Sequence, residues 1–315
     1  MTEPLLIPSK NNRVSSKEKN VIVAQDWDKD FIKKDLHRLL KEKIAYKEQV
    51  KKHQAGRAAN YVYIYDDYLK DKEYKAILTN IERRLEVFEM AGKIIKLTSF
   101  SNPRVIIEDE MRHGTGTVVI VGNEITLSRV FLRAADLETV FGFLPVGQKN
   151  NQLAEALGIP VDEKACDILA ARKIEKIDYG VVNQKYFFVS NVYIPATALQ
   201  FSCDDRFSIA APREKMEVAI TNLLPPPFAI NKFQPRPQDG KLEFYLHSAS
   251  GGIMSYLGGN RKKGSVSLFT FKKLFLKSDK TVPVIVDGHT MQEGSLSIEV
   301  SKKRMALIVG KDRSF

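Results

Sequence analysis

The sequence has few cysteines and no motif of the kind that binds zinc. Its two cysteines, Cys166 and Cys203, lie far apart, without C-x-x-C spacing and without a histidine cluster beside them. A zinc site is therefore unsupported by the available ligands. We expect both cysteines to be small buried side chains in a reducing compartment.

Long apolar runs are also absent. No run reaches the roughly 18–20 residues that a membrane-spanning helix needs. The opening MTEPLLIPSKNNR lacks the basic-then-apolar order of a secretory signal. These absences predict a cytoplasmic protein. At 315 residues, with 43% hydrophobic and 28% charged residues, the chain is long enough for two globular domains.

The net charge of +11 is concentrated near the start of the chain. Residues 1–60 hold 14 Lys and Arg against 8 Asp and Glu, a balance of +6, which leaves +5 for the other 255 residues. A basic extension attracts anionic lipid or nucleic acid, or simply keeps the protein solvated. No cluster of base-stacking aromatic residues accompanies these lysines, so peripheral membrane contact is favoured over nucleic-acid binding.

The hydrophobic pattern divides the chain into three parts. Residues 1–59 are polar at first and then predict a surface helix over Asp28–His53. Residues 60–165 alternate strand and helix patterns, which predicts an α/β layer built on a parallel sheet. Residues 166–315 hold many strand-like runs separated by Gly and Pro turns, which predicts a β-rich, sandwich-like domain.

Within the α/β layer, short apolar runs predict buried strands and periodic segments predict helices. The continuous β-branched run Thr117–Val121 is typical of a strand buried on both faces of a parallel sheet. The other elements predicted there are strands over Tyr61–Tyr65, Lys93–Leu97 and Val140–Pro145, and helices from Tyr74 to Gly92, over Thr126–Ala135 and over Gln152–Leu157, the last capped by Asn151.

The β-rich part has more predicted strands than helices. They are Lys173–Val182, Lys185–Val192, Met216–Thr221, Leu242–His247, Ser265–Phe275, Val282–Val286, Ser295–Val300 and Met305–Val309.

Two strand-to-helix loops are the first candidates for a site, because ligands bind beyond the carboxyl ends of parallel strands. The loop after Val121 reads GNEIT and offers a glycine, an acid and a threonine at the start of a helix. The loop after Leu144 reads PVGQKNN, where Gly147 lets the backbone approach a phosphate and Lys149 can neutralise it. Each loop also has a purely structural interpretation, since Gly and Asn are common in such turns.

The two loops together resemble the catalytic domain of the diacylglycerol kinase family, which includes bacterial lipid kinases and sphingosine kinases. The strings VVIVGNEITLSRVF and FLPVGQKNNQLAEALGIP match that family's two nucleotide loops in order and spacing. The segments KIDYG, QDGKL and VIVDGH follow in the family's order, so that the resemblance covers about residues 60–310. It implies a two-domain lipid-kinase fold, with ATP and Mg²⁺ as cofactors.

The resemblance also implies roles for individual residues. ATP is expected to lie over one set of positions, Asp239 is expected to bind Mg²⁺, and Asp287 is expected to accept the proton of a lipid hydroxyl. The expected nucleotide positions are Gly122, Asn123, Glu124, Ile125 and Thr126 in the first loop and Gly147, Lys149 and Asn150 in the second.

Several residues depart from the family pattern. Ile125 replaces a glycine, Arg129 replaces a glutamate and His289 replaces another, while Asp66 and Asp67 stand where the family has an N-P-x-S-G turn. Two carboxylates are a poor environment for a triphosphate. Two hypotheses follow. One is a lipid kinase with an unusual, impaired site; the other is a catalytically inactive pseudokinase that binds lipid, nucleotide or protein.

Overall fold

The structure is a computed structural model that describes residues 60–147, 151–204, 207–210, 215–228, 230, 232–248 and 266–315. These residues all belong to one compact unit, His53–Phe315. The helix predicted over Asp28–His53 lies outside them, as do Lys149 and Asn150. None of the described helices is long and apolar enough to cross a membrane.

Sheet A carries the α/β layer and has six strands in the order β2-β1-β3-β4-β16-β5. Neighbouring strands run parallel from β2 to β16, whereas β5 is antiparallel to β16. The strands are β1 Asn60–Asp66, β2 Lys93–Leu97, β3 Thr115–Gly122, β4 Val140–Pro145, β5 Ile174–Ile177 and β16 Met305–Ile308.

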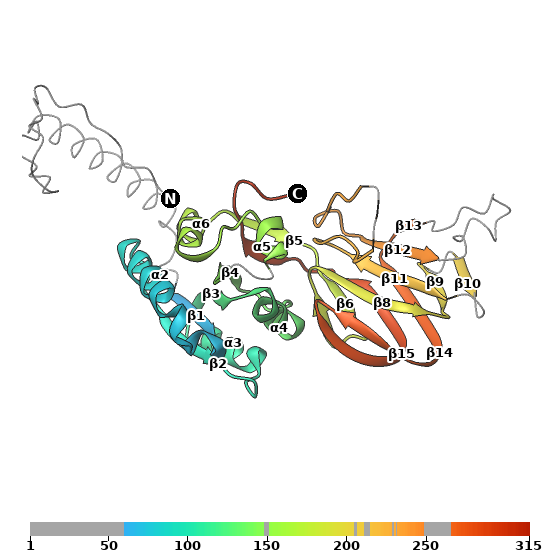
Figure 1. The fold of residues 1–315 in the computed structure, drawn as a ribbon, viewed down its shortest axis with the longest axis horizontal. Coiled ribbons are helices and arrows are strands. Elements are labelled where there is room, and N and C mark those ends of the chain that lie inside the picture. The colour runs from blue at the N-terminus through green and yellow to red at the C-terminus, as the bar shows by residue number, and fades with distance from the viewer. Residues whose placement is uncertain are drawn as a thin grey trace, which may run out of the picture. The chain divides into compact units, whose positions relative to one another are not determined.

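Helices cover this sheet, as the blue-to-green part of Figure 1 shows. The residues of β3 from Val118 to Val121 are completely buried, as expected of a strand covered on both faces. Contacts pair α3 with α4 and α2 with α6. The helices are α2 Lys75–Val87, α3 Pro103–Arg112, α4 Glu124–Ala134, α5 Gln152–Ala156 and α6 Ala165–Ala171.

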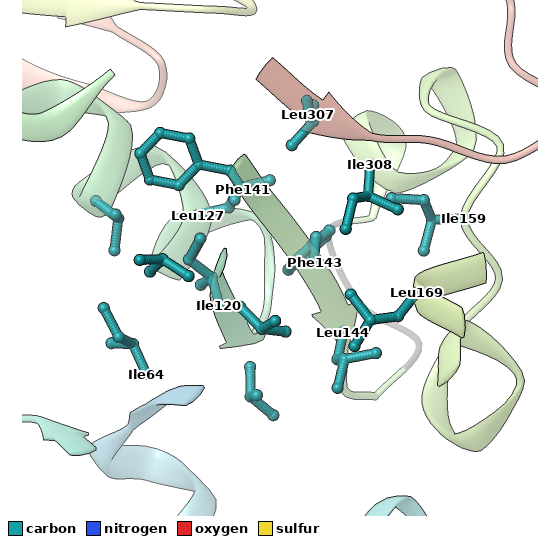
Figure 2. Packing of buried hydrophobic residues seen from close by; sticks show 14 of the residues in the cluster. Ile64, Ile120, Leu127, Phe141, Phe143, Leu144, Ile159, Leu169, Leu307 and Ile308 are labelled. Carbon is teal, nitrogen blue, oxygen red and sulfur yellow. The ribbon is translucent and has the colours of Figure 1, made fainter. Parts of the chain in front are cut away.

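The last strand in the sequence, β16, returns to sheet A and lies between β4 and β5. Leu307 and Ile308 of this strand pack beside Phe141 and Phe143 of β4 (Figure 2). The predicted boundary at residue 166 therefore does not follow the sheets. Both β5 and β16 lie on the C-terminal side of that boundary but complete the α/β layer.

Sheet B is a ten-stranded antiparallel sheet with its own hydrophobic core. Its main path is β13-β12-β11-β8-β14-β15-β6-β7, and β9 and β10 branch from β14. Leu132 of α4 is buried in the core of this sheet, so α4 touches both layers. The strands are β6 Gly180–Val182, β7 Tyr186–Phe188, β8 Asn191–Thr197, β9 Gln200–Cys203, β10 Phe207–Ala210, β11 Met216–Thr221, β12 Leu242–Ser248, β13 Val266–Phe271, β14 Lys273–Val286 and β15 His289–Val300.

The predicted two-layer architecture is confirmed, and some element boundaries are wrong. The strand predicted over Lys173–Val182 is two strands, β5 and β6, which belong to different sheets. The helix predicted to close at Gly92 ends at Val87. The sequence pattern missed α3 and α6, and the strands β9 and β10.

Candidate functional site

A pocket of about 520 Å³ lies where the loops after β3 and β4 meet the β14–β15 turn of sheet B. It has mostly polar walls. Three acidic residues from separate segments line it, Glu124, Glu155 and Asp287. The remaining lining residues are Ile125, Ser128, Asn151, Gln152, Ser190, Asn191, Leu224 and Gly288.

The backbone N–H groups at the start of α4 are capped by side chains of the same segment. Asn123 is the N-cap, and its side chain and that of Thr126 form a reciprocal capping box. Thr126 Oγ1 also donates to Asp66 Oδ2 at 2.7 Å. Gly122 permits this arrangement, because a Cβ there would lie 2.5 Å from Thr126 Oγ1. A helix start that would otherwise receive an anion already has a carboxylate beside it.

In the second loop, backbone groups also form hydrogen bonds with side chains of this chain. Gly147 has a φ of +84°, in the region that favours glycine, and its N–H donates to Asp162 Oδ1 at 3.0 Å. Asn151 does not cap α5 with a hydrogen bond as predicted. Its Nδ2 donates to the carbonyl of Gly147 at 2.6 Å instead, which ties the two ends of the loop together.

Glu124 points across the pocket to the start of α5. Its Oε2 accepts a hydrogen bond from the backbone N–H of Leu153 at 3.3 Å. Burial raises the pKa of Glu124, because the loss of hydration outweighs the backbone N–H groups of Leu153 and Gln152; the nearby charge of Glu155 raises it further. Glu124, which stands where the resembling family has an aspartate, therefore accepts a hydrogen bond from α5, the helix that follows the second loop.

Asp287 is held at the tight β14–β15 turn by the loop between β7 and β8. Its two oxygens accept hydrogen bonds from the backbone N–H groups of Val189, Ser190 and Asn191 at 2.8–2.9 Å. The residue is only 8% exposed, and burial raises the pKa of its carboxyl group to about 6 despite these three donors. The three backbone donors therefore fix the orientation of this buried carboxyl group.

Asp239 is not among the residues that line this pocket. Its Oδ1 accepts from the backbone N–H of Lys241 in a local turn. The buried acid of this region is Asp178, whose Oδ1 accepts from Arg304 Nε at 2.7 Å and whose Oδ2 accepts from the N–H of Gly240 at 2.7 Å. Asp178 lies in the quoted segment KIDYG, and the sequence pattern assigned it no role because its partners, Gly240 and Arg304, are far away along the chain.

Of the two basic residues that stand where the resembling family has acids, Arg129 has structural partners, whereas the buried Nε2 of His289 has no hydrogen-bond partner. Arg129 Nη2 donates to the carbonyl of Leu97 at 3.1 Å and lies 3.8 Å from Asp66 Oδ2. His289 is partly buried, and burial together with the charge of Arg129 lowers its pKa, which favours a neutral imidazole. Neither side chain lines the pocket.

The structure therefore brings together some of the predicted site residues. Glu124 and Asp287 face the same pocket. Gly122, Asn123 and Thr126 form the adjacent helix cap, and Gly147 forms the neighbouring turn. The residues that sequence reasoning missed are Asp162, Glu155 and Ser190. Glu155 lies within the quoted string FLPVGQKNNQLAEALGIP, whereas Asp162 and Ser190 lie in no motif, and only the folded chain places all three at or beside the pocket.

The described residues do not fit a triphosphate with its magnesium ion. The hydroxyl of Thr126 in α4, the N–H of Gly147 and the N–H of Leu153 in α5 already donate to Asp66, Asp162 and Glu124 respectively. No Lys or Arg is among the pocket's lining residues in the described part of the chain. Phosphate binding requires such donors and cations.

Comparisons with known proteins were made by sequence and by structure. No family model and no curated relative matches the sequence. Three solved structures from Bacillus anthracis str. Sterne match the fold, each named a diacylglycerol kinase, two of them provisionally. Their TM-scores are 0.62–0.63 at 14–15% identity, over 80–81% of this chain and 98% of theirs. This chain therefore has the two-domain fold of those diacylglycerol kinases.

Proposed function

We propose that this chain is a diacylglycerol-kinase-like protein whose pocket receives a lipid hydroxyl, with Asp287 as the base for its phosphorylation. The observation that carries the proposal is the position of Asp287. Asp287 lines the pocket, its carboxyl group is fixed by three backbone donors, and its pKa is raised to about 6. A carboxylate of that proton affinity can accept a hydroxyl proton near neutral pH.

ATP and Mg²⁺ are the phosphoryl donor and the metal implied by the shared fold. Thr126, Gly147 and Leu153 already donate hydrogen bonds to the chain's own carboxylates. The described residues therefore support binding of the lipid hydroxyl better than binding of ATP. This observation favours a second candidate function, in which the protein binds a ligand in the same pocket without phosphorylating it.

An assay with radiolabelled ATP and Mg²⁺ over diacylglycerol, sphingosine and polyprenol separates the two candidates. Kinase activity predicts labelled lipid that is lost in Asp287→Asn, with the variant's melting temperature retained. Label transfer that survives in Asp287→Asn would remove Asp287 as the base. Absence of label with every lipid, together with absence of ATP binding in calorimetry, supports the binding function.

A further inference from the structure

The backbone groups that bind Asp287 belong to a segment that a second residue holds from the opposite side. Oδ1 of Asp287 accepts from the N–H groups of Ser190 and Asn191, and the backbone N–H of Asp287 donates in return to the carbonyl of Asn191 at 2.9 Å. A carboxylate bound in this way is oriented only as well as the peptide groups that bind it. Whatever fixes those peptide groups therefore decides how Asp287 is presented to the pocket.

Asn222, the residue that follows β11, binds the carbonyl ends of the same two peptide groups. Its side-chain Nδ2 donates to the carbonyl of Val189 at 3.0 Å, and its backbone N–H donates to the carbonyl of Ser190 at 3.0 Å. A trans peptide group is planar, with its C=O and its N–H pointing in opposite directions. Each of the two planes is thus held at both ends, by Asn222 on one side and by Asp287 on the other.

A hydrogen bond at the carbonyl end of a peptide group also strengthens the donor at its other end. Chains of hydrogen bonds polarise one another in a protein interior, where the local dielectric is low. Asn222 is only 1% exposed and Asp287 is buried as well, so this chain of hydrogen bonds runs through the interior. The backbone donors that favour the charged form of Asp287 therefore depend on Asn222.

The remaining hydrogen bond of Asn222 ties the segment to sheet A. Its Nδ2 also donates to the carbonyl of Asp178 at 2.8 Å, in the connection between β5 of sheet A and β6 of sheet B. The wall of the pocket opposite Asp287 is formed by the starts of α4 and α5, which belong to the layer of sheet A. Asn222 therefore also fixes Asp287 relative to that wall.

The side-chain oxygen of Asn222 makes no hydrogen bond. It is buried and has no partner within the described part of the chain. The two carbonyl acceptors identify the bonded atom as the nitrogen, since an oxygen there could not donate. A buried oxygen left unpaired costs stability, so this amide is explained by the position that its amino group gives to the backbone and not by a full set of hydrogen bonds.

We propose that Asn222 is a positioning residue for Asp287, which holds two peptide groups so that their N–H groups point at the carboxylate. Its part in catalysis rests on the proposed function, in which Asp287 is the base; the positioning itself requires no turnover. Among the described residues, Glu124 and Glu155 line the same pocket, His289 lies two residues along the chain, and the charge of Glu124 raises the pKa of Asp287. The variants below change none of these groups.

The test is an NMR titration of the full chain without ATP, in which the carboxyl signal of Asp287 is identified by its loss in Asp287→Asn. In Asn222→Ala the proton affinity of Asp287 should rise at least about threefold, because weaker donors stabilise its charged form less. Leu246→Ala is the control variant, since it removes a buried side chain from the core of sheet B and should leave that proton affinity unchanged. An unchanged proton affinity in folded Asn222→Ala overturns the proposal.

A titration of the wild type tests the same chain of hydrogen bonds without relying on the folding of a variant. The side-chain amide protons of Asn222 should shift with the midpoint at which Asp287 titrates, and this shift should disappear in Asp287→Asn. If Asn222→Ala does not fold, this titration decides, and amide protons that ignore the titration of Asp287 overturn the proposal.

The kinase assay adds a readout that a purely structural residue would not move. Where label transfer is found, Asn222→Ala should shift the acidic limb of the pH profile of kcat to higher pH, while KM for the lipid stays the same. A profile that keeps its midpoint contradicts the role of Asn222 in catalysis. Absence of label transfer removes the proposed function and leaves both titrations as tests of the positioning.

Discussion

Replacing Asp287 by asparagine tests whether the buried carboxylate is a base or a structural anchor. Asparagine has the same shape but no charge. The three backbone donors of Val189, Ser190 and Asn191 favour the charged side chain, and burial opposes it. Since the pKa rises from 3.8 to about 6, burial dominates. Asp287→Asn should therefore change the free energy of unfolding by no more than about 1 kcal/mol at pH 7, with loss of any turnover.

The pKa of Asp287 predicts how much its contribution to the free energy of unfolding changes with pH. A raised pKa means that the folded state binds the proton at higher pH than the unfolded state. Stability contributed by Asp287 is therefore present below about pH 4 and is lost as the pH rises to about 6. At about 1.4 kcal/mol for each unit of pKa difference, the change from 3.8 to about 6 amounts to about 3 kcal/mol.

Urea unfolding of the wild type and of Asp287→Asn at pH 4, 5, 6 and 7 measures this. The difference between the two proteins isolates Asp287 from other groups, such as Glu243, whose pKa burial raises to about 7. Asp287→Ala is the contrasting variant, because it leaves the three donors unpaired and should cost at least about 3 kcal/mol. If Asp287→Asn loses as much stability at pH 7 as Asp287→Ala, the carboxylate is a charged anchor and our reasoning fails.

Other predictions concern the closed loops and the C-terminal strand. Asp162→Gly should release the N–H of Gly147 and strengthen Mg-ATP binding in calorimetry relative to the wild type; unchanged binding would show that Asp162 does not block the site. Gly122→Ala should destabilise the protein by about 1–3 kcal/mol, and Thr126→Ala should recover part of that loss in a double-mutant cycle; strictly additive effects would contradict the close contact. Leu307→Ala should cost about 2–5 kcal/mol in urea unfolding, and a loss below about 1 kcal/mol would contradict its place in the core.

Much of the fold could be predicted because its signals are local. The run Thr117–Val121 indicates a strand buried on both faces whatever surrounds it, and the structure confirms this. By contrast, Met305–Val309 shows that a strand exists but not which sheet it joins, since pairing depends on partners far away in the sequence. The helix α3 was missed although Asn102 caps it and Pro103 stands at its first position, because its apolar residues are clustered within a segment rich in charge.

The candidate site was predictable only in part, for a related reason. Its loops follow buried strands, and this locates Glu124 from the sequence alone. What those loops contact is set by the tertiary structure. Asp66 lies 60 residues from Thr126, and Asp162 lies 15 from Gly147. No rule of sequence spacing connects such pairs. The hydrogen bonds that Asp66 and Asp162 accept at these loops are therefore seen only in the folded protein.

The position of β16 has a consequence for biosynthesis. Because β4 pairs with β3 on one side and with β16 on the other, sheet A cannot be completed until residues 305–308 have left the ribosome. By then the whole of sheet B has been translated. The α/β segments stay with one edge of β4 unpaired until then, so released chains truncated at residue 300 should be far more sensitive to protease than the full chain.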